Sequence, residues 1–294
     1  MQEFMSKNGL LELIHPLDHA ELLKHFKLNK PFVIHHLENE LTELRKLPFL
    51  ESLDDLIKAW PSHVQVHLPD LRDEVSAINV PTNEAKNYFD QGMALLFNDV
   101  NTISPVLETW LNQMKSDLGI SSRSYGRCLV YAIPDGKGTA AHFDQNINFV
   151  LQIHGTKKWT LATNESVLNP MDRFTMGLPV EQEMMSYLDA QMPETMPQET
   201  FSFELKPGSL LFVPRGVWHA TEADGDALSL NFTFTAPAWM DLFLGALRSR
   251  LILSSEWRET AMIADEKKFD SLLRILINDL PNWNAKDILE AIES

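Results

Sequence analysis

The chain has 294 residues, of which 44% are apolar and 22% are charged, and its 41 acidic and 25 basic side chains give a formal net charge of −16. This composition is typical of a globular protein and excludes a disordered or collagen-like chain. The negative balance argues against binding of a nucleic acid, because that binding depends largely on Lys and Arg neutralising phosphates. It suits a basic partner instead.

The single cysteine, Cys128, excludes internal disulfides and a Cys-rich zinc site, and it fits a reducing compartment. No run approaches the roughly 18 apolar residues that a bilayer crossing requires. Near the N-terminus, Glu3, Lys7 and Asn8 interrupt what would be the apolar core of a signal peptide. We therefore expect a cytoplasmic protein without a membrane partner.

Residues 1–120 are expected to form an N-terminal α/β extension. Within 10–26 the apolar residues follow a helical spacing that Pro16 interrupts. Ser104 followed by Pro105 predicts a helix start, because Ser caps a first turn and Pro fits its first position. The short strands expected in this part are 31–36, 63–68 and 93–100.

Residues 121–237 consist of short β-rich runs separated by turn residues. Such runs without intervening helices favour a barrel or a jelly roll. Gly155 and Gly225 are expected to lie in turns between neighbouring strands. The predicted strands are 125–133, 141–145, 148–153, 158–162, 201–205, 209–213, 217–222 and 227–235.

The segment 163–200 interrupts this β-rich part and holds half of the chain's 12 methionines. Methionine suits surfaces that repack around a ligand, and long loops are often functional, which favours an active-site lid. An ordinary packed insertion with a short helix explains the same residues equally well. Both interpretations stay open.

Residues 238–294 are expected to be helical, over 238–253, 269–280 and 285–293, with Asn284 capping the last helix. These helices carry more apolar surface than docking on a barrel requires, so we expect a homodimer. Packing against the same chain is the alternative. The apolar residues concerned are Leu242, Leu247, Leu251, Leu272, Leu276 and Leu280.

A metal site of two His and one carboxylate needs ligands that converge on one face. His142 and Asp144 supply two of them on a predicted strand, where residues two apart point the same way. His219 supplies a third on a later strand, after a Pro-Gly turn and a Pro-Arg-Gly bend. These three residues are therefore the candidate metal ligands.

Two other triplets have the same His-x-carboxylate form. His19 and Glu21 fall in a predicted helix, where residues two apart diverge. His36 and Glu38 close a strand beside an acidic, solvated stretch. Neither is expected to bind a metal.

Around the candidate ligands, the sequence resembles the JmjC/cupin-fold iron(II)- and 2-oxoglutarate-dependent oxygenases. The similarity to ribosomal-protein oxygenases rests on GMALLFNDVNTISPVLETW, HFDQNINFVLQIHGTKKW and LKPGSLLFVPRGVWHA. The similarity to the asparaginyl hydroxylase of hypoxia-inducible factor rests on TAAHFDQNINFVLQIHGTKK and the Asn of LSLNF. The resemblance covers 92–236 and implies a mainly β double-stranded β-helix, the cupin or JmjC jelly roll, between the N-terminal α/β extension and the C-terminal helices.

The resemblance also implies roles for individual residues. His142, Asp144 and His219 are expected to bind iron. Lys157 is expected to pair with the distal carboxylate of 2-oxoglutarate, with Thr139 helping to hold it. Asn148 and Asn231 match two asparagines near the metal and the other end of the co-substrate.

Some of these assignments have alternatives. Tyr131 could reach the co-substrate or pack inside the barrel, and Arg127 could be a second carboxylate clamp or a surface charge. Lys157 could lie at the surface beside Lys158. Asn148 and Asn231 could be hydrogen-bonded core amides.

The activity implied is that of a dioxygenase that uses Fe(II), 2-oxoglutarate and O₂ to hydroxylate a protein or peptide side chain. An acidic surface can steer a basic segment, which favours a protein substrate. A small-molecule substrate, such as an amino acid or a natural product, is the alternative. A cupin that binds a metal without turnover is a further alternative from a different class.

Overall fold

The computed structural model describes residues 9–39, 41–69 and 76–293. Glu3, Lys7 and Asn8, on which the expectation about a signal peptide rests, lie outside these ranges. The chain divides into two compact units. One contains the described residues up to Gly119 together with Tyr125–Thr235, and the other contains Ile120–Ser124 and the chain from Ala236 onward.

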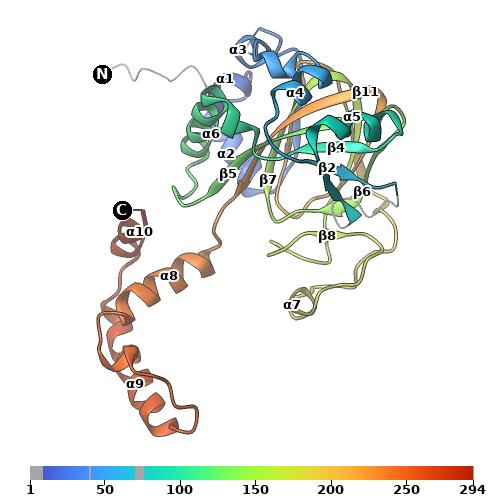
Figure 1. Cartoon of the computed structure of the whole chain (residues 1–294). Helices are drawn as coiled ribbons and strands as arrows, with labels where there is room; N and C mark the ends of the chain where they lie inside the picture. Colours follow the sequence, from blue (N-terminus) through green and yellow to red (C-terminus); the bar gives the residue numbers. More distant parts are fainter. Residues whose placement is uncertain (1–8, 40, 70–75, 294) are drawn as a thin grey trace, which may run out of the picture. The chain divides into compact units, whose positions relative to one another are not determined.

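The first unit is built on one antiparallel sheet of 11 strands, which confirms the predicted mainly β jelly roll (Figure 1). Its main path runs β1-β10-β7-β11-β5-β4-β2-β3, with β6 added on β11, β8 on β6 and β9 on β7. The strands are β1 (Phe32–Ile34), β2 (Val64–His67), β3 (Ile78–Val80), β4 (Ala94–Phe97), β5 (Tyr125–Ile133), β6 (Gly138–Phe143), β7 (Ile147–Ala162), β8 (Phe174–Thr175), β9 (Thr200–Leu205), β10 (Leu210–Val213) and β11 (Trp218–Thr235).

The two turns expected at Gly155 and Gly225 were wrong, because β7 and β11 run through them as continuous strands. Both glycines have positive φ, 67° and 75°. A Cβ on Gly155 would lie 2.1 Å from the Asp226 carbonyl oxygen, so only glycine allows this approach of the strands. The register between β7 and β11 shifts after Asp224, and the signals that predicted turns therefore mark an irregularity inside a long paired ribbon.

The N-terminal residues add small helices and four strands, with β2, β3 and β4 at one end of the sheet and β1 at the other (Figure 1). The helix break at Pro16 and the helix start at Ser104 are confirmed, since the Leu107 amide donates to the Ser104 hydroxyl. Neither α4 nor α5 was predicted. The helices are α1 (Leu10–Leu13), α2 (His19–Lys27), α3 (Thr42–Arg45), α4 (Leu53–Ala59), α5 (Thr82–Asp90) and α6 (Pro105–Leu118), with short 3-10 turns at Pro48–Leu50 and Val100–Ile103.

The two rejected triplets have structural roles or lie in solvent. Glu21 closes a capping box with Asp18 at the start of α2, and the His19 ring nitrogen bonds to the Asp117 carbonyl. His36 and Glu38 are both exposed.

The segment 163–200 is a packed insertion that contains β8 and the short helix α7 (Gln182–Met185). Met184 is buried beside Phe143 and Trp218, and Met176, Met192 and Met196 pack against the same cluster. Four of the six methionines of the insertion therefore belong to a hydrophobic core, which supports the packed insertion over a lid.

The second unit is helical, as expected. It contains α8 (Trp239–Leu251), α9 (Glu266–Asp279) and α10 (Ala285–Glu293), with short 3-10 turns at Glu256–Arg258 and Leu280–Asn282. Arg250 makes two hydrogen bonds to Asp279, of 2.9 and 2.8 Å, and the Trp283 indole donates a third. These bonds lower the pKa of Asp279 to about 2.

Gly138 allows β6 and β11 to approach closely, and its replacement tests how tightly the sheet is built there. A Cβ on Gly138 would lie 1.6 Å from the Thr221 carbonyl oxygen, so one strand must move. We expect Gly138→Ala to destabilise the fold by roughly 1–3 kcal/mol, as overpacking does. Thermal unfolding measures this loss.

Gly245→Ala is the matched control, because a Cβ on this helical glycine meets nothing within 4 Å. We expect it to be neutral or slightly stabilising, since Ala favours a helix over Gly. An equal fall in melting temperature for both variants would contradict the close approach at Gly138.

Candidate active site

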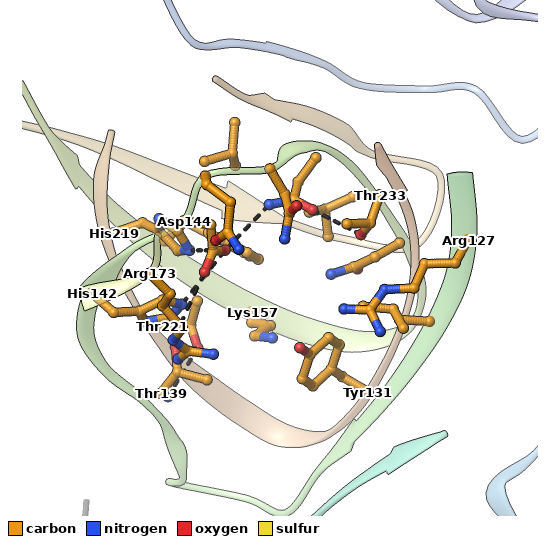
Figure 2. Close-up of a pocket in the computed structure, with 18 of the residues that line it drawn as sticks. Arg127, Tyr131, Thr139, His142, Asp144, Lys157, Arg173, His219, Thr221 and Thr233 are labelled. Carbon is orange, nitrogen blue, oxygen red and sulfur yellow. Dashed lines mark hydrogen bonds and ion pairs between the residues drawn. The ribbon is translucent and has the colours of Figure 1, made fainter. Parts of the chain in front are cut away.

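A cavity of about 270 Å³ opens between the strands of the jelly roll (Figure 2). Its walls come from β5, β6, β7 and β11, and the insertion contributes Asp172 and Arg173. All eight residues singled out from the sequence line it. They are Tyr131, Thr139, His142, Asp144, Asn148, Lys157, His219 and Asn231.

His142, Asp144 and His219 meet on one wall of this cavity, with one potential ligand atom from each lying within 4.8 Å of the others. His142 on β6 and His219 on β11 are direct partners in the strand register. Their ring centroids are 4.1 Å apart, and the Trp159 ring stacks on His219 at 5.7 Å. The carboxylate of Asp144 completes the set just beyond the end of β6.

Each histidine is held in the tautomer that a metal needs. The Nδ1 atom of His142 lies 2.7 Å from the Ala140 carbonyl oxygen, and that of His219 lies 2.9 Å from the Val217 carbonyl oxygen. A carbonyl only accepts, so both Nδ1 atoms must carry the proton. Both Nε2 atoms then present lone pairs toward Asp144 Oδ2, at 4.0 and 3.6 Å.

A hydrogen-bond relay orients the carboxylate. The Thr233 hydroxyl donates to Asn148 Oδ1 at 2.7 Å, and Asn148 Nδ2 donates to Asp144 Oδ2 at 3.3 Å. On the other side of the carboxylate, Arg173 Nε lies 3.8 Å from Asp144 Oδ1. The carboxylate is therefore held between an amide and a guanidinium.

The amide of Asn231 is buried at the cavity wall. Its Oδ1 accepts no hydrogen bond from any residue that the structure describes. A buried polar atom without a partner is costly, and one that faces a cavity is placed to bind a ligand. Together with the two imidazole lone pairs and the carboxylate, it shows that these residues fit a divalent metal carrying a polar co-substrate.

Lys157 is buried, with only 2% of its surface exposed, which excludes the surface lysine alternative. Its ammonium lies 5.6 Å from the centre of the Tyr131 ring and 5.1 Å from that of Trp159. An ammonium between aromatic rings in a cavity is suited to pairing with a carboxylate.

Thr139 reaches the same cavity because of a β-bulge. Its hydroxyl bonds to that of Thr221 at 2.9 Å. Residues three apart on a regular strand point to opposite faces, so Thr139 and His142 should diverge. The register shifts between His219 and Thr221, which places one extra residue on β6 and turns both side chains inward.

Sequence reasoning missed three contributors, Arg173, Thr221 and Thr233. Arg173 comes from the insertion, and no local pattern marked it. Thr233 was visible as a residue sharing the inward face of its strand with Asn231, but its bond to Asn148 depends on the pairing of β11 with β7. Arg215, from the Pro-Arg-Gly bend, lies outside this cavity and donates to the Pro170 carbonyl, which anchors the insertion.

A double-stranded jelly roll with two imidazoles and one carboxylate on its inner wall is the scaffold of a cupin-type metalloenzyme. The comparisons agree with this class. Residues 108–242 match the model of the JmjC domain family. A Bacillus subtilis (strain 168) protein with the description uncharacterized protein YxbC is 31% identical over 264 residues, which cover 88% of this chain and 80% of that protein.

The chain belongs to the JmjC family of iron(II)- and 2-oxoglutarate-dependent oxygenases, which confirms the predicted family and enzyme class. Ribosomal oxygenase 2 of Mus musculus is 30% identical over 123 residues, or 40% of this chain and 23% of that protein. A solved structure of YcfD, a ribosomal oxygenase from Escherichia coli, in complex with cobalt and 2-oxoglutarate has a TM-score of 0.57 at 17% identity. The match covers 94% of this chain and 69% of that one and shows the same fold.

Removing the Thr233 hydroxyl tests the relay that ends on Asp144. Thr233→Val keeps the shape of the side chain but leaves Asn148 without its donor, so the carboxylate is less well oriented. Changes to groups that orient a metal ligand typically cost about 10–100-fold in metal affinity, and we expect a loss at the lower end of this range. Calorimetric titration with Zn(II) measures it.

Thr102→Val is the matched control, since it removes an exposed hydroxyl that bonds only to the Asp99 carbonyl. We expect the control to bind Zn(II) as the wild type does. Equal Zn(II) affinity for the Thr233→Val variant would show that the relay does not position Asp144.

Proposed function

We propose that this protein hydroxylates a protein or peptide side chain, with His142, Asp144 and His219 binding iron. The observation that carries the proposal is the convergence of two imidazole Nε2 atoms and one carboxylate on a cavity that also holds a buried lysine. Residues 121–237 would form the catalytic core, flanked by residues 1–120 and followed by a dimerisation region at 238–294.

Iron, 2-oxoglutarate and O₂ together would supply the oxidising power that inserts one oxygen atom into a C–H bond, with succinate and CO₂ as co-products. The role of the protein is to hold and orient. Lys157 would neutralise the distal carboxylate of the co-substrate, and Thr139 would hydrogen-bond to it. Asn148 and Asn231 would bind near its other end, where the unpartnered Asn231 oxygen faces the cavity.

The descriptions of the relatives support a protein substrate. Ribosomal oxygenase 2 and YcfD are both described as ribosomal oxygenases, which favours a protein substrate for this chain as well. Gln145 and Asn146 line the cavity beside Asp144 and could contact that substrate. A small molecule is the alternative, and a reducing cytoplasm, where Fe(II) persists, is the compartment that suits either reaction.

Among the described residues, none of the helices has the length and apolar content needed to cross a membrane. The second unit instead exposes many large apolar side chains. On α8, Met240, Phe243 and Leu244 are 52%, 46% and 52% exposed, and their spacing places them on one face. We propose that this face pairs with a second copy of the chain, because exposed apolar patches mark interfaces.

Anaerobic addition of Fe(II) and 2-oxoglutarate should produce the visible charge-transfer band of the chelated complex. We expect His142→Ala to lose this band and Lys157→Met to need a much higher concentration of 2-oxoglutarate to reach it, because the buried cation is gone. In the presence of cell extract, we expect the wild type to turn over 2-oxoglutarate, His142→Ala to be inactive, and Lys157→Met to need a higher concentration of 2-oxoglutarate.

Mass spectrometry of proteins from the incubated extract then identifies the substrate class. Gain of one oxygen atom on a protein, in the wild-type reaction only, supports the proposal. Stimulation by the small-molecule fraction alone would favour the alternative, and absence of the band in folded wild-type protein would exclude the proposed metal site.

The dimer can be tested separately. We expect light scattering to give twice the mass of the chain for the wild type and for Lys267→Asp, an exposed substitution near the start of α9. Leu244→Asp should give the monomer mass, because it places a charge in the apolar interface. A monomeric wild type would contradict the dimer.

A further inference from the structure

Arg127 is a cation of the cavity that the proposed co-substrate and metal do not use. It lies on β5 and lines the cavity together with Leu129 and Tyr131, which share its face of the strand. Figure 2 shows its guanidinium reaching inward from β5. In the part of the chain that the structure describes, no carboxylate lies within ion-pair distance of it, although a guanidinium carries five donors.

The strand register places Arg127 away from the lysine that would hold the co-substrate. Arg127 pairs with Thr233 on β11, and Thr233 pairs with Asn148 on β7, so the three share one row across the sheet. Tyr131, beside Lys157, lies four residues further along β5, a distance of about 13 Å between Cα atoms. Leu129 lies between them on the same face of β5 and also lines the cavity.

The same register brings Arg127 level with the candidate metal centre. Asn148, in its row, donates to Asp144. Two strand spacings of about 4.8 Å separate the backbone of Arg127 from that of Asn148. The guanidinium therefore faces the candidate metal centre from the opposite wall, and the space between them is where a substrate would lie.

The charges of the cavity favour an anion at this place. Lys157, Arg127 and Arg173 line it against Asp144 and Asp172. A divalent metal and Lys157 would bring three positive charges, which the two negative charges of the proposed co-substrate and the one on Asp144 balance. Arg173 lies 3.8 Å from Asp144. Asp172 is exposed at the surface, so the charge on Arg127 is left for another group.

We propose that Arg127 binds a carboxylate of the primary substrate and thereby selects an acidic substrate. This carboxylate is the side chain of an Asp or Glu in a peptide or the acid group of a small molecule. The inference rests on the proposed function, since it names the substrate class of the same site. It replaces the earlier alternatives for Arg127, a co-substrate clamp and a surface charge.

The net charge of −16 does not prevent this selection. Exposed charges are screened beyond about 10 Å at 0.1 M salt, whereas a guanidinium bound directly to a carboxylate is screened much less. The acidic surface disfavours a run of acidic residues but not a single carboxylate. A substrate with one acidic group in a neutral or basic segment is compatible with the acidic surface and still offers a carboxylate to Arg127.

The test uses the full chain loaded with Zn(II), which replaces iron, and N-oxalylglycine, a non-reactive analogue of 2-oxoglutarate. The probes are end-blocked pentapeptide mixtures with uncharged flanks and either Asp and Glu or Asn and Gln at the centre. A second arm compares N-acetyl amino acids with their amides. Thermal shifts over a concentration series report binding, because a ligand stabilises the state that it binds.

We expect the acidic probes of one arm to bind the wild type better than their amides. Arg127→Gln should weaken that binding about tenfold or more, as the loss of a charge-assisted hydrogen bond does. Arg127→Lys should retain part of it, because Lys keeps the charge but not the forked geometry. Arg258→Gln, an exposed arginine of the second unit, is the matched control and should bind as the wild type does.

Three results would overturn the inference while leaving the proposed function intact. These are equal binding of acidic and amide probes, no binding of acidic probes at millimolar concentration, and weaker binding of N-oxalylglycine to Arg127→Gln, which would make Arg127 a co-substrate clamp. Failure of the wild type to bind Zn(II) and N-oxalylglycine would contradict the proposed function and this inference with it. The arm that responds identifies the source of the carboxylate.

Discussion

The antiparallel pairing of β6 with β11 is the constraint on which the candidate active site depends. It sets His142 directly opposite His219, so that two histidines far apart in the chain become cross-strand neighbours. The bulge on β6 turns Thr139 toward the same cavity, where its hydroxyl bonds to that of Thr221. Gly138 permits this pairing, since any side chain there would meet the backbone of β11. Strand pairing alone therefore places four polar side chains of the site.

Buried polar groups in this jelly roll are organised by backbone carbonyls and by one another. The carbonyls of Ala140 and Val217 place the proton on the Nδ1 atom of each imidazole, so that the Nε2 atom carries the lone pair that a metal binds. Thr233 and Asn148 orient the carboxylate of Asp144 through two successive hydrogen bonds. Such networks are costly to bury unless each member is satisfied. The Asn231 oxygen, which has no hydrogen-bond partner among the described residues, faces the cavity.

The cavity separates two cations within a protein of strongly negative charge. Lys157 on β7 lies beside Tyr131 of β5. Arg127 lies on the same face of β5, four residues before Tyr131. We propose that the two cations bind different anions, one on the co-substrate and one on the substrate. The net charge describes the outer surface and does not describe this interior, where direct contacts outweigh screened charges.

Much of the fold follows from patterns in the sequence, since alternating apolar residues and turn signals marked most strands of the jelly roll. The glycines at 155 and 225 misled because positive φ suits both a turn and an irregular paired strand, and only the partner strand decides between them. Arg173 could not be found, because its approach to Asp144 depends on how the insertion packs.

The sequence by itself determined the chemistry of this protein: the identity and spacing of His142, Asp144 and His219, a lysine between them in the chain and a single cysteine. Residue types and local periodicity carry that information, because they act over a few neighbouring positions. The tertiary structure decided which polar groups meet, through the bulge on β6, the relay from Thr233 and the row that holds Arg127. Strand register decides these contacts, and register is set by pairing between segments that are distant in the chain.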